Sequence, residues 1–231
     1  MVKNHLARLA APKTWQIARK KSKWIVRPHP GSQKLEHSLP LQFILREMLE
    51  IASTAREARH ILNQKTVFIN KKVRCDPRYG VGLFSLIEIP SLKKTVTLVL
   101  NKQGKLELKE VDSKSLSLLK ITHRSVGKGG KMQIHCHDGR TILSDEKCKV
   151  GDSLIFDLQH KKIKEIIPFE EQKRAYLLGG KHVGEIVQIK KIPARENLGR
   201  PYLFVDFNGK EFRALKEHTF VIGDKEILHV Q

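Results

Sequence analysis

The chain has 231 residues, of which 40% are hydrophobic and 6% aromatic, and its 44 Lys and Arg outnumber its 24 Asp and Glu to give a formal net charge of +20. So large a positive charge indicates a polyanionic partner, either nucleic acid or an anionic membrane surface. The apolar run at residues 95–100 is too short for the ~18 residues that a membrane span requires, so we expect no membrane partner and favour nucleic acid.

The first 35 residues contain nine Lys and Arg and no Asp or Glu. Such a segment lacks the apolar surface needed to fold, so we predict a basic arm over residues 1–40, with residues 1–35 disordered in the free protein and ordered only against RNA. Aromatic rings among cations can stack on unpaired bases. The alternative is that Trp15 and Trp24 pack on the protein's own core. The RNA contacts expected here are Lys13, Trp15, Arg19, Lys20 and Lys21.

Two helices are predicted after this arm. Apolar residues at positions 41, 44, 45, 48 and 49 recur with the period of an amphipathic helix. A second helix should begin at Thr54, because Thr54 and Glu57 have the spacing of a capping box. We expect this helix to bury residues 55, 58, 61 and 62 and to present Arg56, Arg59 and His60 together on its other face.

A strand is predicted after the second helix, since Val67 and Ile69 alternate with Phe68 and Asn70 before a turn at residues 71–72. The whole stretch from Pro40 to Asp76 thus becomes a compact basic unit with few acidic residues. Its cations should contact phosphate groups without reading base sequence. They are Arg56, Arg59, His60, Lys65, Lys71, Lys72 and Arg74.

Strands dominate the prediction for residues 94–169. A hairpin is expected around residues 101–104, and Asp138-Gly139 predicts a type I′ turn between two further strands. Residues 112–119 could form a short helix capped by Asp112 or Ser113. Six or so short strands separated by turns indicate a small β-barrel or sandwich.

The glycine-rich stretch at residues 127–131 lacks the Ser/Thr and the following helix of a phosphate-binding loop. We therefore interpret it as a flexible basic loop that contacts RNA through Lys128 and Lys131.

The triplet at residues 135–137 places only two histidines on one strand face, whereas structural zinc takes four ligands, so no metal is expected. Three cysteines without a C-x-x-C pair indicate reduced thiols in the cytosol.

The last segment begins with Gly179, Gly180, Lys181 and Gly184, and we expect Lys181 to contact RNA. Phe204, Val205 and Phe207 indicate a strand, and Asn208-Gly209 is a second type I′ turn signal before the chain returns.

Several of these motifs resemble known families. Ala58-Arg59, Ile61-Leu62, Val67, Ile69 and Asn70 match the small RNA-binding module of ribosomal protein S-four, with Lys65 and Lys71 in place of its two glycines. Residues 6–15 resemble the start of the archaeal and eukaryotic-type family of small-subunit ribosomal protein four. Residues 179–184 resemble a KOW motif, with Val187 where a further glycine is expected. An archaeal source is favoured, because the basic C-terminal extension of eukaryotic members is missing.

The resemblance implies an α+β multidomain protein with a basic N-terminal arm (1–40), an S-four-type α/β RNA-binding module (41–91), a central β domain (92–170) and a C-terminal SH3-like KOW barrel (171–231). It further implies a cytoplasmic, structural component of the ribosome that binds small-subunit rRNA and other ribosomal proteins, supports assembly and translation, and has no cofactor.

Two rival hypotheses come from other classes. A pseudouridine-synthase-like RNA-modifying enzyme would need a catalytic base, and the acidic residues are scattered over helix faces and turns. A KOW-type transcription factor has no use for an all-basic N-terminal segment. We therefore expect no enzyme activity, no small-molecule substrate and a ribosomal role.

Overall fold

The computed structural model describes residues 5–111, 116–127, 130–144, 146–193 and 201–223. It is built mainly from β-strands with few helices, and it divides into two compact units. The first unit comprises residues 1–99 and 105–115, and the second comprises residues 100–104 and 116–231. No helix in the described part of the chain is long and apolar enough to cross a membrane.

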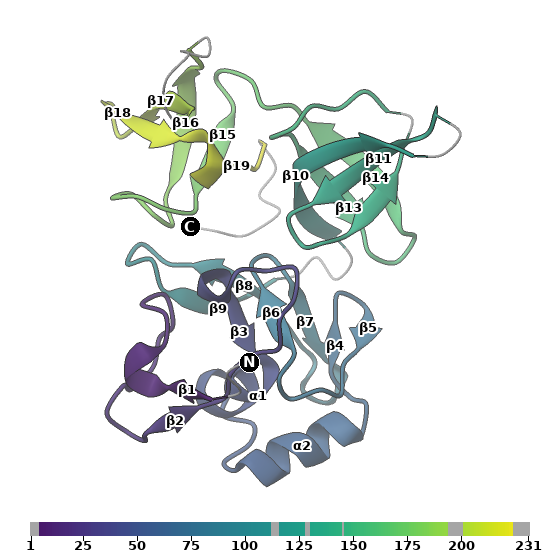
Figure 1. Cartoon of the computed structure of the whole chain (residues 1–231), viewed down its shortest axis with the longest axis vertical. Coiled ribbons are helices and arrows are strands. Elements are labelled where there is room, and N and C mark those ends of the chain that lie inside the picture. The colour runs from purple at the N-terminus through teal and green to yellow at the C-terminus, as the bar shows by residue number, and fades with distance from the viewer. Residues whose placement is uncertain (1–4, 112–115, 128–129, 145, 194–200, 224–231) are drawn as a thin grey trace. The chain divides into compact units, whose positions relative to one another are not determined.

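The first unit combines three small sheets with two helices (Figure 1). Its elements are β1 (Leu6–Ala7), β2 (Trp24–Ile25), β3 (Ser38–Pro40), α1 (Leu41–Phe43), α2 (Ala55–Asn63), β4 (Phe68–Ile69), β5 (Lys72–Val73), β6 (Gly80–Gly82), β7 (Leu86–Ile89), β8 (Lys94–Leu100) and β9 (Leu106–Glu110). β1 pairs with β2, β3 pairs with β6, and the third sheet has the order β5-β4-β7-β8-β9.

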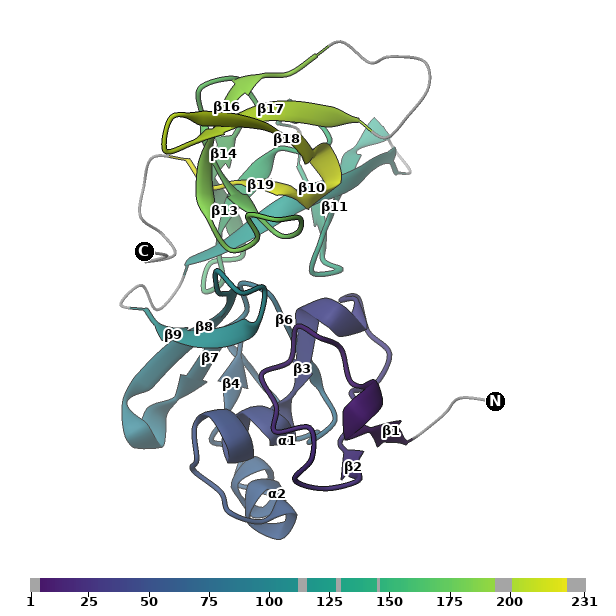
Figure 2. The ribbon, with the colours of Figure 1, turned by 90° about the vertical axis from the view of Figure 1, so that its left-hand side faces the viewer.

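The predicted amphipathic helix at residues 41–49 is confirmed as α1 followed by a π-helical turn, Ile44–Met48. Its apolar side is buried, with Leu41, Ile44 and Leu45 at 0% exposure. α1 and α2 pack against each other (Figure 2). This packing stabilises two helical segments that are too short to be stable alone.

The N-terminal segment is folded, and the prediction of disorder is wrong for residues 5–35. Trp15 is only 2% exposed, its ring centroid lies 6.1 Å from that of Phe43, and its indole N–H donates to the carbonyl of Leu35 at 3.2 Å. Leu6 and Ile25 are also buried. The segment could not fold by itself, but it gains the apolar surface of the α1 region, which the composition of residues 1–35 does not reveal.

The sheet of the first unit continues past the boundary that we predict at residue 92. β8 pairs antiparallel with β7 through Ile87 and Val96, and β9 is the next strand of that sheet. The predicted hairpin at residues 101–104 is confirmed between β8 and β9, with Gly104 at φ 72°. The division of the chain into four separate domains stays a prediction.

The second unit contains two five-stranded antiparallel sheets (Figure 1). The first has the order β12-β11-β10-β13-β14 and the second β18-β17-β16-β15-β19. Their strands are β10 (Leu116–Val126), β11 (Met132–Cys136), β12 (Thr141–Leu143), β13 (Ser153–Asp157), β14 (Lys162–Ile167), β15 (Arg174–Leu177), β16 (Ile186–Lys191), β17 (Tyr202–Phe207), β18 (Lys210–Leu215) and β19 (Thr219–Val221).

Two local expectations in this unit are wrong. The helix expected at residues 112–119 is not formed at Leu116–Leu119, which lie in β10 and pair with β13; residues 112–115 lie outside the described part. The turn at Asp138-Gly139 exists, but only Gly139 has positive φ. The Gly139 N–H donates to the Cys136 carbonyl at 3.0 Å, and the Asp138 carboxylate accepts the Arg140 N–H at 3.0 Å, so the loop is closed by local hydrogen bonds with a left-handed conformation at Gly139 alone. At the other site, Asn208 and Gly209 both have positive φ, as a type I′ turn requires.

Lys120 lies between the two sheets of the second unit. Its ammonium donates to the backbone carbonyls of Thr219 at 2.6 Å, Glu217 at 3.0 Å and Lys216 at 3.3 Å. Burial, followed by the nearby charge of Lys216, lowers the pKa of Lys120 from 10.5 to about 8. A partly buried ammonium is thus held by three backbone carbonyl groups.

Candidate nucleic-acid interface

The exposed face of α2 carries the first group of predicted contacts. Arg56, Arg59 and His60 are all exposed there, while Ala58 and Leu62 are buried on the opposite face at 0%. The two arginines therefore point to solvent from a helix whose other side is fixed in the core. Such an arrangement can bring two guanidinium groups to a phosphate backbone at the same time.

The capping box holds the start of this helix. The Thr54 hydroxyl accepts the Glu57 N–H at 3.2 Å, and the Glu57 carboxylate accepts the N–H groups of Ser53 at 2.8 Å and Thr54 at 3.4 Å. The hydrogen bond from Ser53, followed by that from the Thr54 side chain, lowers the pKa of Glu57. Its negative charge is therefore held at the start of the helix.

The end of α2 and the following hairpin carry four more of the predicted cations. Lys65 and Lys72 are exposed, whereas the Lys71 ammonium is 2.9 Å from the Glu88 carboxylate. Arg74 is half-buried, and its guanidinium lies 4.4 Å from the ring centroid of Tyr79. Lys65 and Lys72 are thus available to a ligand, while Lys71 and Arg74 already have protein partners.

The two lysines in place of family glycines adopt the backbone conformation that glycine favours. Lys65 has φ 59° and Lys71 has φ 63°, both in the left-handed region. Lys65 directly follows the C-cap residue Gln64, and its N–H donates to the Leu62 carbonyl at 3.0 Å. This is the position after a helix at which glycine is most common, so the chain keeps the turn geometry and adds a positive charge.

The predicted contacts in the N-terminal segment separate into two groups. Lys13, Lys20 and Lys21 are exposed. Trp15 is buried and cannot stack on a base in this fold. Arg19 is half-buried and donates to the carbonyls of Ala11 and Pro12, each at 2.9 Å, so it holds the segment together. The expectation that all five contact RNA is corrected for Trp15, because its ring completes the core of the first unit.

The remaining predicted contacts lie in the second unit. Lys131 and Lys181 are exposed, and Lys128 lies outside the described residues. His135 bonds with the side chains of Ser125 at 2.8 Å and Thr141 at 3.1 Å, so its ring is engaged within the sheet. Among the residues that the structure describes, no group of three or more potential metal ligands is present.

Gly184 lies in close contact with the protein itself. It has φ 78°, and a Cβ at this position would lie 2.2 Å from the carbonyl oxygen of Asn101. Val187, where a further glycine is expected for a KOW motif, is buried at 2% exposure in β16. Gly184 is therefore required by the close approach of the Asn101 backbone, and Val187 packs in the core.

The sequence pattern does not single out Lys23 or Arg46 as contact residues, and it treats Trp24 like Trp15, as an aromatic ring that can stack on a base. Trp24 is 52% exposed, the Lys23 ammonium lies 5.3 Å from its ring centroid, and the His5 ring lies 5.5 Å away. Trp24 thus has the exposure that Trp15 lacks. Only the fold separates the two tryptophans, since both stand among cations in the sequence.

Comparison with known proteins shows similarity over nearly the whole chain. Residues 92–163 match the model of ribosomal family S4e, and residues 2–36 match the RS4NT (NUC023) domain. The chain is 36% identical to a protein of Methanocaldococcus jannaschii named small ribosomal subunit protein eS4, over 97% of this chain and 96% of the relative. It is 37% identical to the protein of that name from Methanothermobacter thermautotrophicus, over 97% and 94%.

A crystal structure of the 30S ribosomal protein S4e from Thermoplasma acidophilum has a similar fold. Its TM-score is 0.70 at 33% sequence identity, and the match covers 83% of this chain and 98% of that chain. These relatives define the class as archaeal ribosomal proteins of the small subunit. The chain belongs to ribosomal family S4e.

Proposed function

We propose that the chain is a structural constituent of the small ribosomal subunit, where it binds rRNA through phosphate contacts, meets other ribosomal proteins and supports assembly and translation in the cytoplasm. The observation that carries the proposal is the near full-length similarity to small-subunit proteins of this family. The net charge of +20 suits a polyanionic partner of this kind. The RNA-modifying enzyme and the transcription factor have no support among these relatives.

We further propose that residues 41–91 act as an S-four-type RNA-binding module. Two exposed arginines on a capped helix beside a basic hairpin support this assignment. The main contact surface would comprise Arg56, Arg59, Lys65 and Lys72, with His60 beside them. Lys71 and Arg74 would contribute less, since each is engaged with a protein partner.

The sheet β18-β17-β16-β15-β19 would be the SH3-like KOW barrel, and the sheet β12-β11-β10-β13-β14 the central β domain. Five short antiparallel strands with a type I′ turn at Asn208-Gly209 support the first assignment. In this arrangement Lys131 and Lys181 would make additional phosphate contacts from exposed positions. Limited proteolysis that releases residues 171–231 as a stable fragment would support a separate barrel domain.

The test of the RNA-binding face is the salt dependence of binding. Replacing Arg56 and Arg59 together by alanine should weaken binding to small-subunit rRNA and reduce the slope of log K against log[salt] by about 1.8, since each phosphate contact contributes about 0.9 on duplex. A double replacement of the exposed Lys147 and Lys149 by alanine removes the same charge elsewhere and should leave most of the slope intact. An equal loss in both variants would show that net charge alone drives binding.

A further inference from the structure

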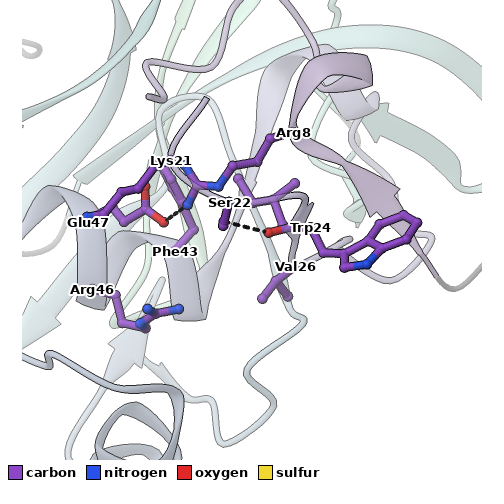
Figure 3. Close-up of a pocket in the computed structure, with 9 residues that line it drawn as sticks. Arg8, Lys21, Ser22, Trp24, Val26, Phe43, Arg46 and Glu47 are labelled. Carbon is purple, nitrogen blue, oxygen red and sulfur yellow. Dashed lines mark hydrogen bonds and ion pairs between the residues drawn. The ribbon is translucent and has the colours of Figure 1, made fainter. Parts of the chain in front are cut away.

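A pocket of about 270 Å³ lies inside the first unit, between the N-terminal segment and the α1 region (Figure 3). Ile25 and Val26 line it from the N-terminal side, and Phe43 and Arg46 line it from the helical side. One water needs roughly 10–15 Å³. The pocket therefore admits a group much larger than a water molecule, such as a phosphate together with its sugar.

Arg8 is the most deeply buried charge in the pocket, with a side chain that is 6% exposed. Its guanidinium pairs with the Glu47 carboxylate and donates to the Ala18 carbonyl at 3.1 Å. Its Nε is shielded from solvent and has no hydrogen-bond partner among the described residues. Figure 3 shows the Arg8 and Glu47 side chains meeting on one side of the pocket, with Arg46 projecting from the same helix as Glu47.

Arg46 has the same unfilled donor. Its Nε is also shielded from solvent and has no hydrogen-bond partner among the residues that the structure describes. A buried N–H without an acceptor is unfavourable, because it has lost its hydrogen bond to water without gaining another. Both arginines that line the pocket thus carry a buried N–H that no described residue fills.

The charge of the pocket defines that acceptor as an anion. Its lining has three cationic side chains, Arg8, Lys21 and Arg46, and one carboxylate, Glu47, which Arg8 already engages. The lining therefore carries a net charge of +2. Guanidinium groups present planar forks of N–H donors that match the oxygens of phosphate.

The exposed indole of Trp24 lies at the edge of this pocket and points away from the other lining side chains (Figure 3). Although the Lys23 ammonium and the His5 ring lie near it, the indole is 52% exposed and keeps surface on which a base can stack. We propose that the pocket binds the phosphate and sugar of one unpaired RNA nucleotide, whose neighbouring base stacks on Trp24. This inference rests on the proposed rRNA binding and adds a site for single-stranded RNA that is separate from the α2 face.

The experiment compares single-stranded and duplex RNA on the full-length chain. The probes are 5′-labelled hexauridylate and a 12-base-pair RNA duplex with no unpaired nucleotide, both followed by fluorescence anisotropy. Arg46→Met removes the Nε–H and the charge but keeps an apolar stem, and Trp24→Ala removes the stacking surface. Arg124→Met, at an exposed position on β10, is the charge-matched control.

Both pocket variants should bind hexauridylate about tenfold more weakly, the size expected for one lost charge-assisted hydrogen bond or one lost base stack. Their affinity for the duplex should remain within about twofold of the control variant, because paired nucleotides cannot enter the pocket. The side-chain Nε–H signals of Arg8 and Arg46 in NMR spectra should shift on addition of hexauridylate. Unchanged urea unfolding midpoints would show that the variants fold. If Arg46→Met does not fold, Trp24→Ala still tests the proposal, because Trp24 is exposed.

Three results would overturn the proposal. Equal affinity of Arg46→Met and Arg124→Met for hexauridylate, with rRNA binding through α2 intact, would remove the pocket and leave the proposed function standing. Saturation of the arginine signals by inorganic phosphate with no preference for hexauridylate would make the pocket a general anion site. Failure of the wild-type protein to bind small-subunit rRNA would remove the proposed function and this site together.

Discussion

Because Lys65 has a left-handed backbone conformation, we expect that replacing it by glycine stabilises the protein, although glycine usually destabilises a folded chain. Lys65 is exposed, has φ 59° and directly follows the C-cap of α2. An L-residue in this conformation is strained by roughly 1–2 kcal/mol. Glycine relieves this strain, although its greater backbone freedom in the unfolded chain costs about 0.5–1 kcal/mol. Lys65→Gly should therefore stabilise the first unit by about 0.5–1 kcal/mol.

Two variants isolate the backbone effect from the loss of charge. Lys65→Ala removes the same ammonium but keeps a Cβ at φ 59°, so its stability should remain near that of the wild type. Gln64→Gly places glycine one residue earlier, at φ −69°, where no strain is relieved, and it should destabilise by about 0.5–1 kcal/mol. The order of stability should be Lys65→Gly, then wild type and Lys65→Ala, then Gln64→Gly.

Tryptophan fluorescence during urea or thermal unfolding measures this order for the correct unit. The chain has two tryptophans, Trp15 and Trp24, and both lie in the first unit, so the signal is insensitive to unfolding of the second. For a unit of about 100 residues the expected gain raises the melting temperature by roughly 2–8 °C. Equal melting temperatures for Lys65→Gly and Lys65→Ala would refute the reasoning, because the strain at this position would then be negligible.

Three further variants test other parts of the fold. Thr54→Ala removes the cap of α2 and should lower the free energy of unfolding of the first unit by about 1 kcal/mol in urea titrations. Ser53→Ala keeps the backbone N–H of residue 53 that donates to Glu57, so it should have little effect. Trp15→Ala should cost about 3–5 kcal/mol as a fully buried aromatic, and Trp24→Ala, at 52% exposure, should stay within about 0.5 kcal/mol of the wild type in the same titration. Lys120 has a pKa of about 8 in the folded chain against 10.5 ordinarily, so it releases its proton more readily when folded. The free energy of unfolding of the wild type should therefore rise relative to that of Lys120→Met between about pH 8 and 10.5, by up to about 1.4 kcal/mol per pH unit. A constant difference across that range in chemical denaturation of the second unit would contradict the burial of this ammonium.

Local signals in the sequence predicted local structure well. The Thr54–Glu57 spacing and the period of residues 41–49 depend on side chains within one or two turns of each other, and the structure confirms both. The helix prediction for residues 112–119 was wrong at Leu116–Leu119, because Leu118 and Leu119 are both buried in a strand of the second unit. Two adjacent buried leucines fit a helix or a fully buried strand equally well, and only pairing with β13 decides between them.

The candidate site was predicted less completely, because burial and ion pairing depend on residues far apart in the sequence. The exposure of Arg56 and Arg59 follows from helix periodicity, and sequence analysis found it. Lys71 and its partner Glu88 are 17 residues apart in the sequence, and Arg8 and its partner Glu47 are 39 residues apart. No count of cations along the chain can separate those that face a ligand from those that hold the protein together.

The folded state of the N-terminal segment changes the energetics proposed for RNA binding. Arg8 and Arg19 hold the segment through hydrogen bonds to Glu47 and to backbone carbonyls, and Trp15 fixes the segment to the α1 region. Lys20 and Lys21 are then held as an exposed, preformed surface. A disordered arm would lose about 1–2 kcal/mol of backbone entropy per residue on binding, whereas here that cost is met during folding. The same phosphate contacts can therefore yield more binding free energy than they would from a flexible tail, provided that the RNA fits the surface already formed.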